Sequence, residues 1–367
     1  MSTTLPQRTR GHPLGAELGP VPMSLPRRVS VRVPVLVATA LLLAAVLLGI
    51  SIGPADVPIL TVLGVFVSHL PLLHLHSGAS RLDQAIIWQI RLPRVVLAGL
   101  VGAMLASGGA SYQGVFRNPL ADPYLLGVAA GAGLGATIVI VSGPHMTELL
   151  PLAAFIGAVG AVTVTYLVGA NAGLRASGAS IVLAGVAVAA LLTAVQTYLQ
   201  QEHSQDLQQV YAWILGSFNV ATWSDVLLIL PYVTLSAVVL LAHRRLLDVL
   251  RVGEDEAGSL GVHATRVRLT IVAAATLGTA AAVAVSGLIG FVGIIVAHTV
   301  RLTAGSSYRV VMPVSMIGGA AFLILADLVA RTAQAPGEIP IGVVTAFVGA
   351  PFFLFVLCSK RAQQGVR

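Results

Sequence analysis

The chain has 367 residues, of which 56% are hydrophobic and only 10% are charged, and its mean hydropathy is +0.91. Soluble proteins carry about 25% charged residues, so this composition excludes an ordinary soluble domain and indicates a polytopic membrane protein. The net charge of +7 arises from basic residues scattered between apolar runs. We therefore interpret these residues as topology signals and expect no nucleic-acid partner. A single cysteine, Cys358, excludes an internal disulfide and a cysteine-based metal site.

The first 30 residues differ in composition from the rest of the chain. They contain five prolines and four arginines but few large apolar side chains, and we predict a flexible cytoplasmic tail over residues 1–30. The apolar run 33–52 follows this tail and has the length of a bilayer span. A cleaved signal peptide is the alternative, but the run lacks a clear small-residue cleavage site.

Further apolar runs of spanning length follow along the chain. They lie at 95–115, 124–141, 150–169, 179–199, 226–242, 310–330 and 340–358. The 32 uncharged residues between Arg268 and Arg301 exceed one span and fall short of two comfortable ones, and Ser286 and Gly287 offer a bend in the middle.

Charge counting separates these two interpretations. If the segment forms two spans, 17 of the 21 Lys and Arg residues lie on the cytoplasmic side and 4 lie outside; if it forms one span, the split is 13 to 8. The positive-inside rule favours the first arrangement. We therefore predict an all-α membrane bundle of ten transmembrane helices with both termini cytoplasmic. Its transmembrane domain covers residues 31–362, with a long cytoplasmic loop at 243–268 and a C-terminal tail at 363–367.

Ionisable groups inside the spans distinguish the classes of transporter, because carboxylates near mid-membrane are expensive and mark ion-coupled carriers. Asp327 is the main carboxylate within a predicted span, and Arg331 follows it four residues later. This spacing predicts a local ion pair near the outer end of the helix. We expect His298 to be packed and hydrogen-bonded rather than a proton relay. An ion-coupled secondary carrier remains the alternative from another class.

The chain has no motif for ATP hydrolysis. A phosphate-binding loop of the form G-x-x-x-x-G-K-[ST] needs a lysine, and the only lysine is Lys360, between Ser359 and Arg361. Any ATP hydrolysis must therefore come from another polypeptide, which would bind ATP and magnesium. We expect no clustered acid, base or metal-ligand residues to face one another within the spans, and therefore no enzyme and no cofactor or metal in this chain.

Two polar segments stand out against the apolar background. On the outer side, Arg91-Leu92-Pro93-Arg94 precedes the second span, and the predicted topology places Arg331 on the same face. Three guanidinium groups are suited to bidentate capture of carboxylates on a partner protein, and anchoring at lipid headgroups is the alternative.

On the inner side, an acidic start with helix-forming spacing predicts a short surface helix that docks in a groove of another protein; a merely solvated loop is the alternative. The residues of this segment are Gly253, Glu254, Asp255, Glu256, Ala257, Gly258, Ser259, Leu260, Gly261 and Val262.

From about Val33 to Cys358 the chain resembles the iron-siderophore, haem and vitamin B12 permease family (FecCD type) of bacterial ABC importers. The resemblance rests on several segments found in order. They are Arg91-Leu92-Pro93-Arg94, Asn118-Pro119-Leu120-Ala121-Asp122-Pro123 with Leu126-Gly127-Val128, the segment from Gly253 to Val262, the segment from Ser286 to His298, and Glu338-Ile339-Pro340-Ile341-Gly342-Val343-Val344-Thr345.

The resemblance implies a dimer of permease subunits with ten helices each, two ATP-binding subunits and an extracytoplasmic substrate-binding protein, in the bacterial cytoplasmic membrane. It implies that Arg91, Arg94 and Arg331 hold glutamates of the binding protein and that the segment from Gly253 to Val262 docks on the ATPase. It also implies a cytoplasmic gate around the central channel, formed by Asn118, Pro119, Leu120, Ser177, Gly178 and Ala179. Gly178 and Ala179 depart from the vitamin B12 permease, which has hydroxyl side chains there.

The cargo can be inferred only from the family that the chain resembles. Ferric siderophore leads because it is the commonest cargo there, and haem and cobalamin remain open. His69, His74 and His76 lie in the outer segment after the first span, but their spacing matches no metal-ligand motif, and we interpret them as part of a solvated loop.

Overall fold

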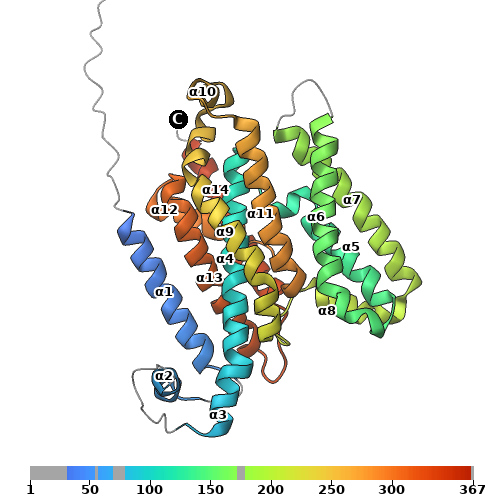
Figure 1. The fold of residues 1–367 in the computed structure, drawn as a ribbon, viewed down its shortest axis with the longest axis vertical. Helices are drawn as coiled ribbons and strands as arrows, with labels where there is room; N and C mark the ends of the chain where they lie inside the picture. The colour runs from blue at the N-terminus through green and yellow to red at the C-terminus, as the bar shows by residue number, and fades with distance from the viewer. Residues whose placement is uncertain (1–30, 54–56, 69–78, 172–177, 365–367) are drawn as a thin grey trace, which may run out of the picture.

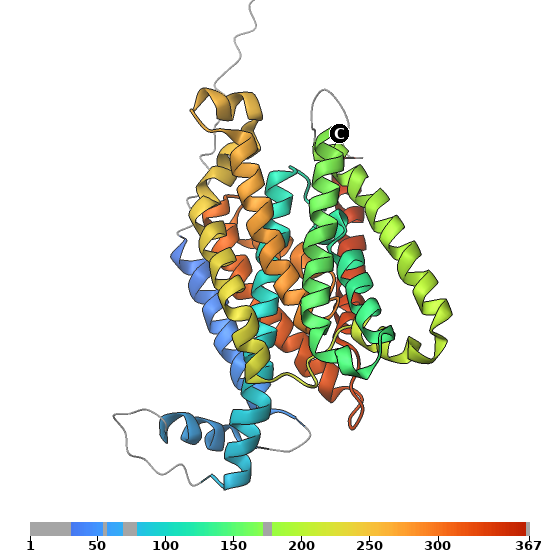
Figure 2. The same ribbon diagram turned by 45° about the vertical axis from the view of Figure 1, so that its right-hand side comes forward.

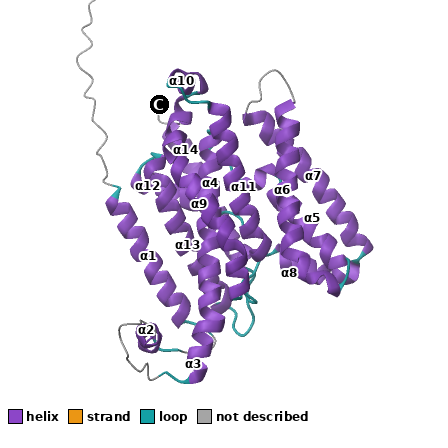
Figure 3. Cartoon of the chain, in the orientation of Figure 1, coloured by secondary structure: helices purple, strands orange, loops and turns teal. Residues whose placement is uncertain are grey.

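The computed structural model describes residues 31–53, 57–68, 79–171 and 178–364, and every regular element in these ranges is a helix (Figure 3). The all-α prediction is confirmed for this part of the chain. The tail 1–30, the three outer histidines and Ser177 lie outside the described residues. The helices are α1 (Arg32–Ser51), α2 (Ile59–Ser68), α3 (Arg81–Ala85), η1 (Ile86–Arg91), α4 (Leu92–Val115), η2 (Pro123–Leu126), α5 (Val128–Val141), η3 (Pro144–Leu149), α6 (Leu150–Asn171), α7 (Gly178–Glu202), η4 (Ser204–Asp206), α8 (Leu207–Ile214), α9 (Trp223–Val252), α10 (Glu254–Ser259), α11 (Ala264–Ser286), α12 (Val292–Ala304), α13 (Tyr308–Thr332) and α14 (Ile341–Gln364).

The long helices run back and forth between two ends of an elongated bundle (Figures 1 and 2). We call these the α10 end and the α3 end. Helices α1, α5, α7, α11 and α13 run towards the α3 end, and α4, α6, α9, α12 and α14 run towards the α10 end. In the described residues, seven helices have the length and apolarity to cross a membrane, and three further apolar helices, Val128–Val141, Val292–Ala304 and Ile341–Val356, are shorter. The alternation agrees with ten crossings, and the ten-span topology stays a prediction.

The segment between Arg268 and Arg301, which the sequence allowed to form one span or two, forms two helices. Helix α11 ends at Ser286, where Gly287 adopts a left-handed φ of +71°, and α12 begins at Val292. The Ser286 carbonyl accepts a hydrogen bond from the Ser217 amide of the α8–α9 loop, at 3.1 Å. The expected bend is confirmed, and the break leaves α12 with only 13 residues.

The segment 243–268 is mostly helical rather than an open loop. Helix α9 continues to Val252 because Leu247 and Leu250 keep an apolar stripe buried while charged residues cover the other side. Only residues 253–263 separate α9 from α11, and they contain α10. Helix α14 likewise extends through Gln364, so it includes residues 363 and 364 of the expected tail.

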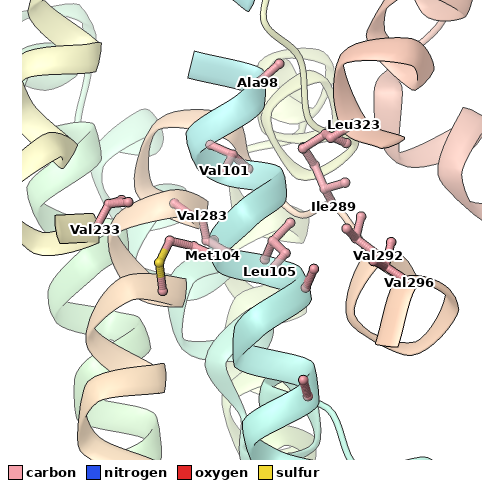
Figure 4. Packing of buried hydrophobic residues seen from close by; sticks show 14 of the residues in the cluster. Ala98, Val101, Met104, Leu105, Val233, Val283, Ile289, Val292, Val296 and Leu323 are labelled. Carbon is pink, nitrogen blue, oxygen red and sulfur yellow. The ribbon is translucent and has the colours of Figure 1, made fainter. Parts of the chain in front are cut away.

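Helix α4 lies at the centre of the bundle and packs against α9, α11, α12 and α13. Helices α5, α6 and α7 form a second group that contacts this centre through α11. The apolar contacts around α4 are shown in Figure 4. They involve Ala98, Val101, Met104 and Leu105 of α4 with Val233 of α9, Val283 of α11, Val292 and Val296 of α12, and Leu323 of α13.

Small residues bring the central helices close together. A Cβ atom added at Gly102 of α4 would collide with the backbone of Gly319 and would lie 2.7 Å from Cβ of Leu323, both on α13. Helices in lipid have no hydrophobic drive to associate, so close backbone packing of this kind is a main source of their stability.

We therefore expect Gly102→Ala to destabilise the bundle by about 1–3 kcal/mol, because the added methyl group meets a backbone that cannot move aside. Gly160→Ala on α6 is the matched control, since its Cβ meets nothing within 4 Å. Alanine favours helix over glycine, so this control should be neutral or slightly stabilising. Thermal unfolding in detergent measures both variants, and equal midpoints would contradict the close packing of α4 on α13.

Candidate functional site

At the α3 end, the Arg94 guanidinium is held between two carboxylates of the same chain. Its Nε and Nη2 atoms donate to the Asp327 carboxylate of α13 at 2.9–3.1 Å. Its Nη1 and Nη2 atoms donate to Oε1 and Oε2 of Glu338, at 2.8 and 2.9 Å, in the loop before α14. Arg94 thus makes bidentate contacts with both partners, which are the strong form of a charge-assisted hydrogen bond.

Arg91 and Arg331 bind the end of α1. Arg91 donates to the carbonyl oxygens of Ile50 and Ser51 at 2.6 and 2.8 Å, and Arg331 donates to the carbonyl of Gly49. The last carbonyls of a helix have no partner within the helix and carry partial negative charge, so two cations are well placed there. These contacts attach α1 to the end of η1, where α4 begins, and to α13.

The Nε atom of Arg331 also lies 3.8 Å from Oδ2 of Asp327, which precedes Arg331 by one helical turn on α13. The expected local ion pair is therefore confirmed, but its geometry is looser than that of the Arg94–Asp327 contact. Asp327 is 2% exposed and forms ion pairs with both Arg94 and Arg331.

The three arginines are buried rather than presented to a partner: Arg91 is 3%, Arg94 8% and Arg331 4% exposed. Their guanidinium groups hold parts of this chain together, so in this conformation they are not free to capture carboxylates of another protein. The expectation of headgroup-anchored arginines does not describe them either. Their role in docking stays a prediction.

Glu338 is a member of this network that the sequence reasoning missed, although it opens one of the quoted motifs. It lies outside the long helices, in an exposed stretch of loop. The hydrogen bond from Arg94 lowers the pKa of the Glu338 carboxyl, against the smaller opposing effect of desolvation. Its contribution to stability is therefore present above the ordinary carboxyl pKa and is lost as the pH falls through the lowered value.

The α10 end carries the predicted docking segment. Glu254–Ser259 forms the short helix α10, as expected, and Ala257 packs into the protein with no exposed surface. The helix ends in a Schellman-type turn, in which the Val262 amide donates to the Ala257 carbonyl at 2.9 Å and Gly261 has a φ of +75°. Leu260 is left strongly exposed beside this turn.

The predicted gate segment begins where α4 ends. The Asn118 amide donates to the Gln113 carbonyl at 3.2 Å, and Arg117 has a φ of +50°, which is uncommon for a residue with a side chain. The side-chain oxygen of Asn118 accepts from the Leu120 amide at 3.0 Å, and Leu120 is exposed.

The second part of the predicted gate lies at the start of α7, which begins at Gly178 near the α10 end (Figure 1). Helix η2 follows the segment 118–120 and packs against α7, where Gly185 leaves room for the Leu125 carbonyl. Helix η2 thus connects the segment 118–120 to a part of α7 seven residues beyond Gly178, and the gate itself stays a prediction.

The fold is that of a multi-pass membrane helical bundle with a buried ionic network at one end and a small surface helix at the other. The chain belongs to the FecCD transport family, whose model matches residues 41–359. It is an ABC importer permease of that family, and the resemblance identified from its motifs is confirmed.

Several curated relatives span most of the chain. The cobalamin import system permease protein BtuC of Halobacterium salinarum is 39% identical over 357 residues, which covers 89% of this chain and 96% of the relative. The hemin transport system permease protein HmuU of Yersinia pestis is 39% identical and covers 76% and 85%. The Fe(3+)-citrate import system permease protein YfmE of Bacillus subtilis is 34% identical and covers 78% and 86%.

A solved structure shares the fold. An inward-facing conformation of a metal-chelate type ABC transporter matches with a TM-score of 0.76 and 30% identity, covering 89% of this chain and 98% of that chain.

Proposed function

We propose that this chain forms the translocation pathway of an importer for a bulky metal chelate, driven by ATP hydrolysis in a separate subunit. The observation that carries this proposal is the family match over nearly all of the described helices. The relatives are named for cobalamin, haemin and ferric citrate, which are all organic complexes of a metal ion. An iron complex, either a ferric siderophore or haem, is our leading cargo, and cobalamin is the alternative.

The proposed assembly contains two permease subunits, two ATP-binding subunits that hold ATP and magnesium, and an extracytoplasmic substrate-binding protein. Exposed Leu260 and the compact turn after α10 support the α10 end as the ATPase-docking and therefore cytoplasmic side. Both chain termini would then lie in the cytoplasm, and the protein would reside in the cytoplasmic membrane.

In this proposal the binding protein docks at the α3 end. Arg94 supports the docking face by holding Glu338 and its exposed loop in place, while Arg91 and Arg331 fix α1 beside it. The gate comprises Asn118, Pro119 and Leu120 with Ser177, Gly178 and Ala179. Short side chains beside a proline break can separate without breaking an ion pair, which supports this assignment.

The proposed function is tested by uptake into proteoliposomes. We expect the permease with its ATPase and binding protein to import the cargo only when ATP is present. The cargo is identified first, by measuring binding of ferric siderophores, haemin and cobalamin to the cognate binding protein. Uptake by the permease alone in a proton or sodium gradient would instead establish an ion-coupled carrier.

A further inference from the structure

At the α10 end, Tyr308 of α13 contacts residues of three other helices, α4, α9 and α12. It is the first residue of α13, and its side chain is buried. The guanidinium carbons of Arg251 and Arg301 lie 5.9 and 5.6 Å from the centre of its ring. Arg251 belongs to the last turn of α9 and Arg301 to the last turn of α12. Two cations on one buried aromatic ring make a compact, polar junction.

One side of this junction leads to α10. The Asp248 carboxylate of α9 accepts from the Tyr308 amide at 2.7 Å and from the Ser307 hydroxyl at 2.8 Å. Arg251 donates to the Ser306 carbonyl at 2.6 Å. Helix α9 ends at Val252 and α10 begins at Glu254, so a displacement of α10 acts on these contacts directly.

The other side leads to the segment 118–120. Arg301 donates to the Tyr308 hydroxyl at 3.1 Å and to the side-chain oxygen of buried Gln113 on α4. The backbone carbonyl of Gln113, in turn, accepts a hydrogen bond from the backbone amide of Asn118. Gln113 also donates to the Gly293 carbonyl of α12, at 3.3 Å, so its side chain is fixed at both ends.

The ring of Tyr308 reaches α4 because Gly114 leaves space for it. A Cβ atom at Gly114 would lie 2.8 Å from Cζ of Tyr308, 2.9 Å from its hydroxyl oxygen and 2.9 Å from Cδ2 of Leu247. The tyrosine and the end of α9 therefore rest on the last turn of α4, immediately before the gate segment.

We infer that Tyr308 and Arg301 are positioning residues that transmit the movement of α10 to the gate segment 118–120. This inference rests on the function proposed above and adds the residues through which ATP hydrolysis would act on the gate. Hydrogen-bond networks between packed helices can carry such coupling. The contacts from Asp248 through Tyr308, Arg301 and Gln113 to Asn118, made partly by side chains and partly by the backbone, form such a network.

The test uses the transporter assembled with its ATPase and binding protein in proteoliposomes, in a Cys358→Ser, Leu120→Cys background. The rate at which a maleimide labels position 120, with and without ATP, reports gate movement. Tyr308→Phe keeps the ring but removes its hydroxyl, and Arg301→Gln removes the charge. Tyr232→Phe, on an exposed part of α9, is the matched control.

We expect both variants to reduce the cargo imported per ATP hydrolysed at least roughly tenfold, because Tyr308→Phe loses one hydrogen bond to a charged group and Arg301→Gln loses two. The ATP-dependent difference in labelling should shrink in the same variants and persist in Tyr232→Phe. Because the two residues act as one unit, the double variant should lose no more than either single one. A merely structural role would lower the thermal unfolding midpoint and leave the response to ATP intact.

Two results would overturn the inference. If Tyr308→Phe and Arg301→Gln respond to ATP as Tyr232→Phe does, the junction does not transmit the movement, although the proposed function stands. If labelling at position 120 does not change with ATP even in the parent protein, the gate assignment fails and the inference fails with it.

Discussion

Arg94→Ala is expected to destabilise the protein by about 3–5 kcal/mol, because it leaves the buried Asp327 carboxylate without its hydrogen-bonded partner. Asp327 is 2% exposed, and three of its hydrogen bonds come from Arg94. Arg331 is too distant to replace them, at 3.8 Å from the carboxylate. Thermal unfolding in detergent measures the loss.

The control for this prediction is Arg81→Ala, an exposed arginine at the same end of the bundle. It should shift the unfolding midpoint little, since exposed ion pairs contribute about 0–1 kcal/mol. Adding Asp327→Asn to Arg94→Ala should recover part of the stability by removing the orphaned charge. An Arg94→Ala variant as stable as Arg81→Ala would contradict the buried network.

The same variants separate support of the docking face from direct contact. If Arg94 acts by holding Glu338, Glu338→Gln should weaken binding-protein docking in the same direction as Arg94→Ala while leaving the Arg94–Asp327 contact in place. A direct Arg94 contact to the partner predicts instead that Glu338→Gln leaves docking unchanged or strengthens it. The dissociation constant of the binding protein for the reconstituted transporter distinguishes the two.

Leu260→Asp is expected to weaken association with the ATPase by at least about 30-fold, the effect of a truncated interface hot spot of roughly 2 kcal/mol. Leu260 is 69% exposed next to α10 and is apolar, so the proposed groove on the ATPase would cover it. An aspartate there would carry its charge into that groove.

Val220→Asp provides the matched control, because Val220 is 79% exposed and precedes α9 by three residues. Helix α9 begins towards the α3 end (Figure 1). Co-purification of the ATPase should fall for Leu260→Asp and stay at the parent level for Val220→Asp. Loss of the ATPase in Val220→Asp alone would place the ATPase at the α3 end and reverse the proposed orientation in the membrane.

The broad outline of the fold could be predicted because it depends on local properties of the sequence. Apolar runs of spanning length, the glycines at the bend after Ser286 and the acidic start of α10 each act within one or two helical turns. The distribution of arginines favoured an even number of helices between the termini. The structure accordingly has helices at every expected place, and it extends several of them beyond the apolar run, as at α9.

The local Asp327–Arg331 pair could be predicted from its spacing, but the long-range partners of the charged residues could not. Arg94 and Asp327 are 233 positions apart in the sequence, and neither spacing nor periodicity relates them. Their contact depends on the close approach of α4 and α13, which the glycines at 102 and 319 permit. The sequence alone therefore suggested outward-facing arginines, whereas the packing of the helices buries them.

The sequence by itself determined the class of this protein, the positions of its helices and its family, because hydropathy, charge bias and short motifs are all read along the chain. Only the tertiary structure decided that Arg91, Arg94 and Arg331 bind their own chain, and that Tyr308 lies between α9, α12 and α4. The physical reason is that a buried charge or ring is satisfied by whatever the fold brings within a few ångströms of it.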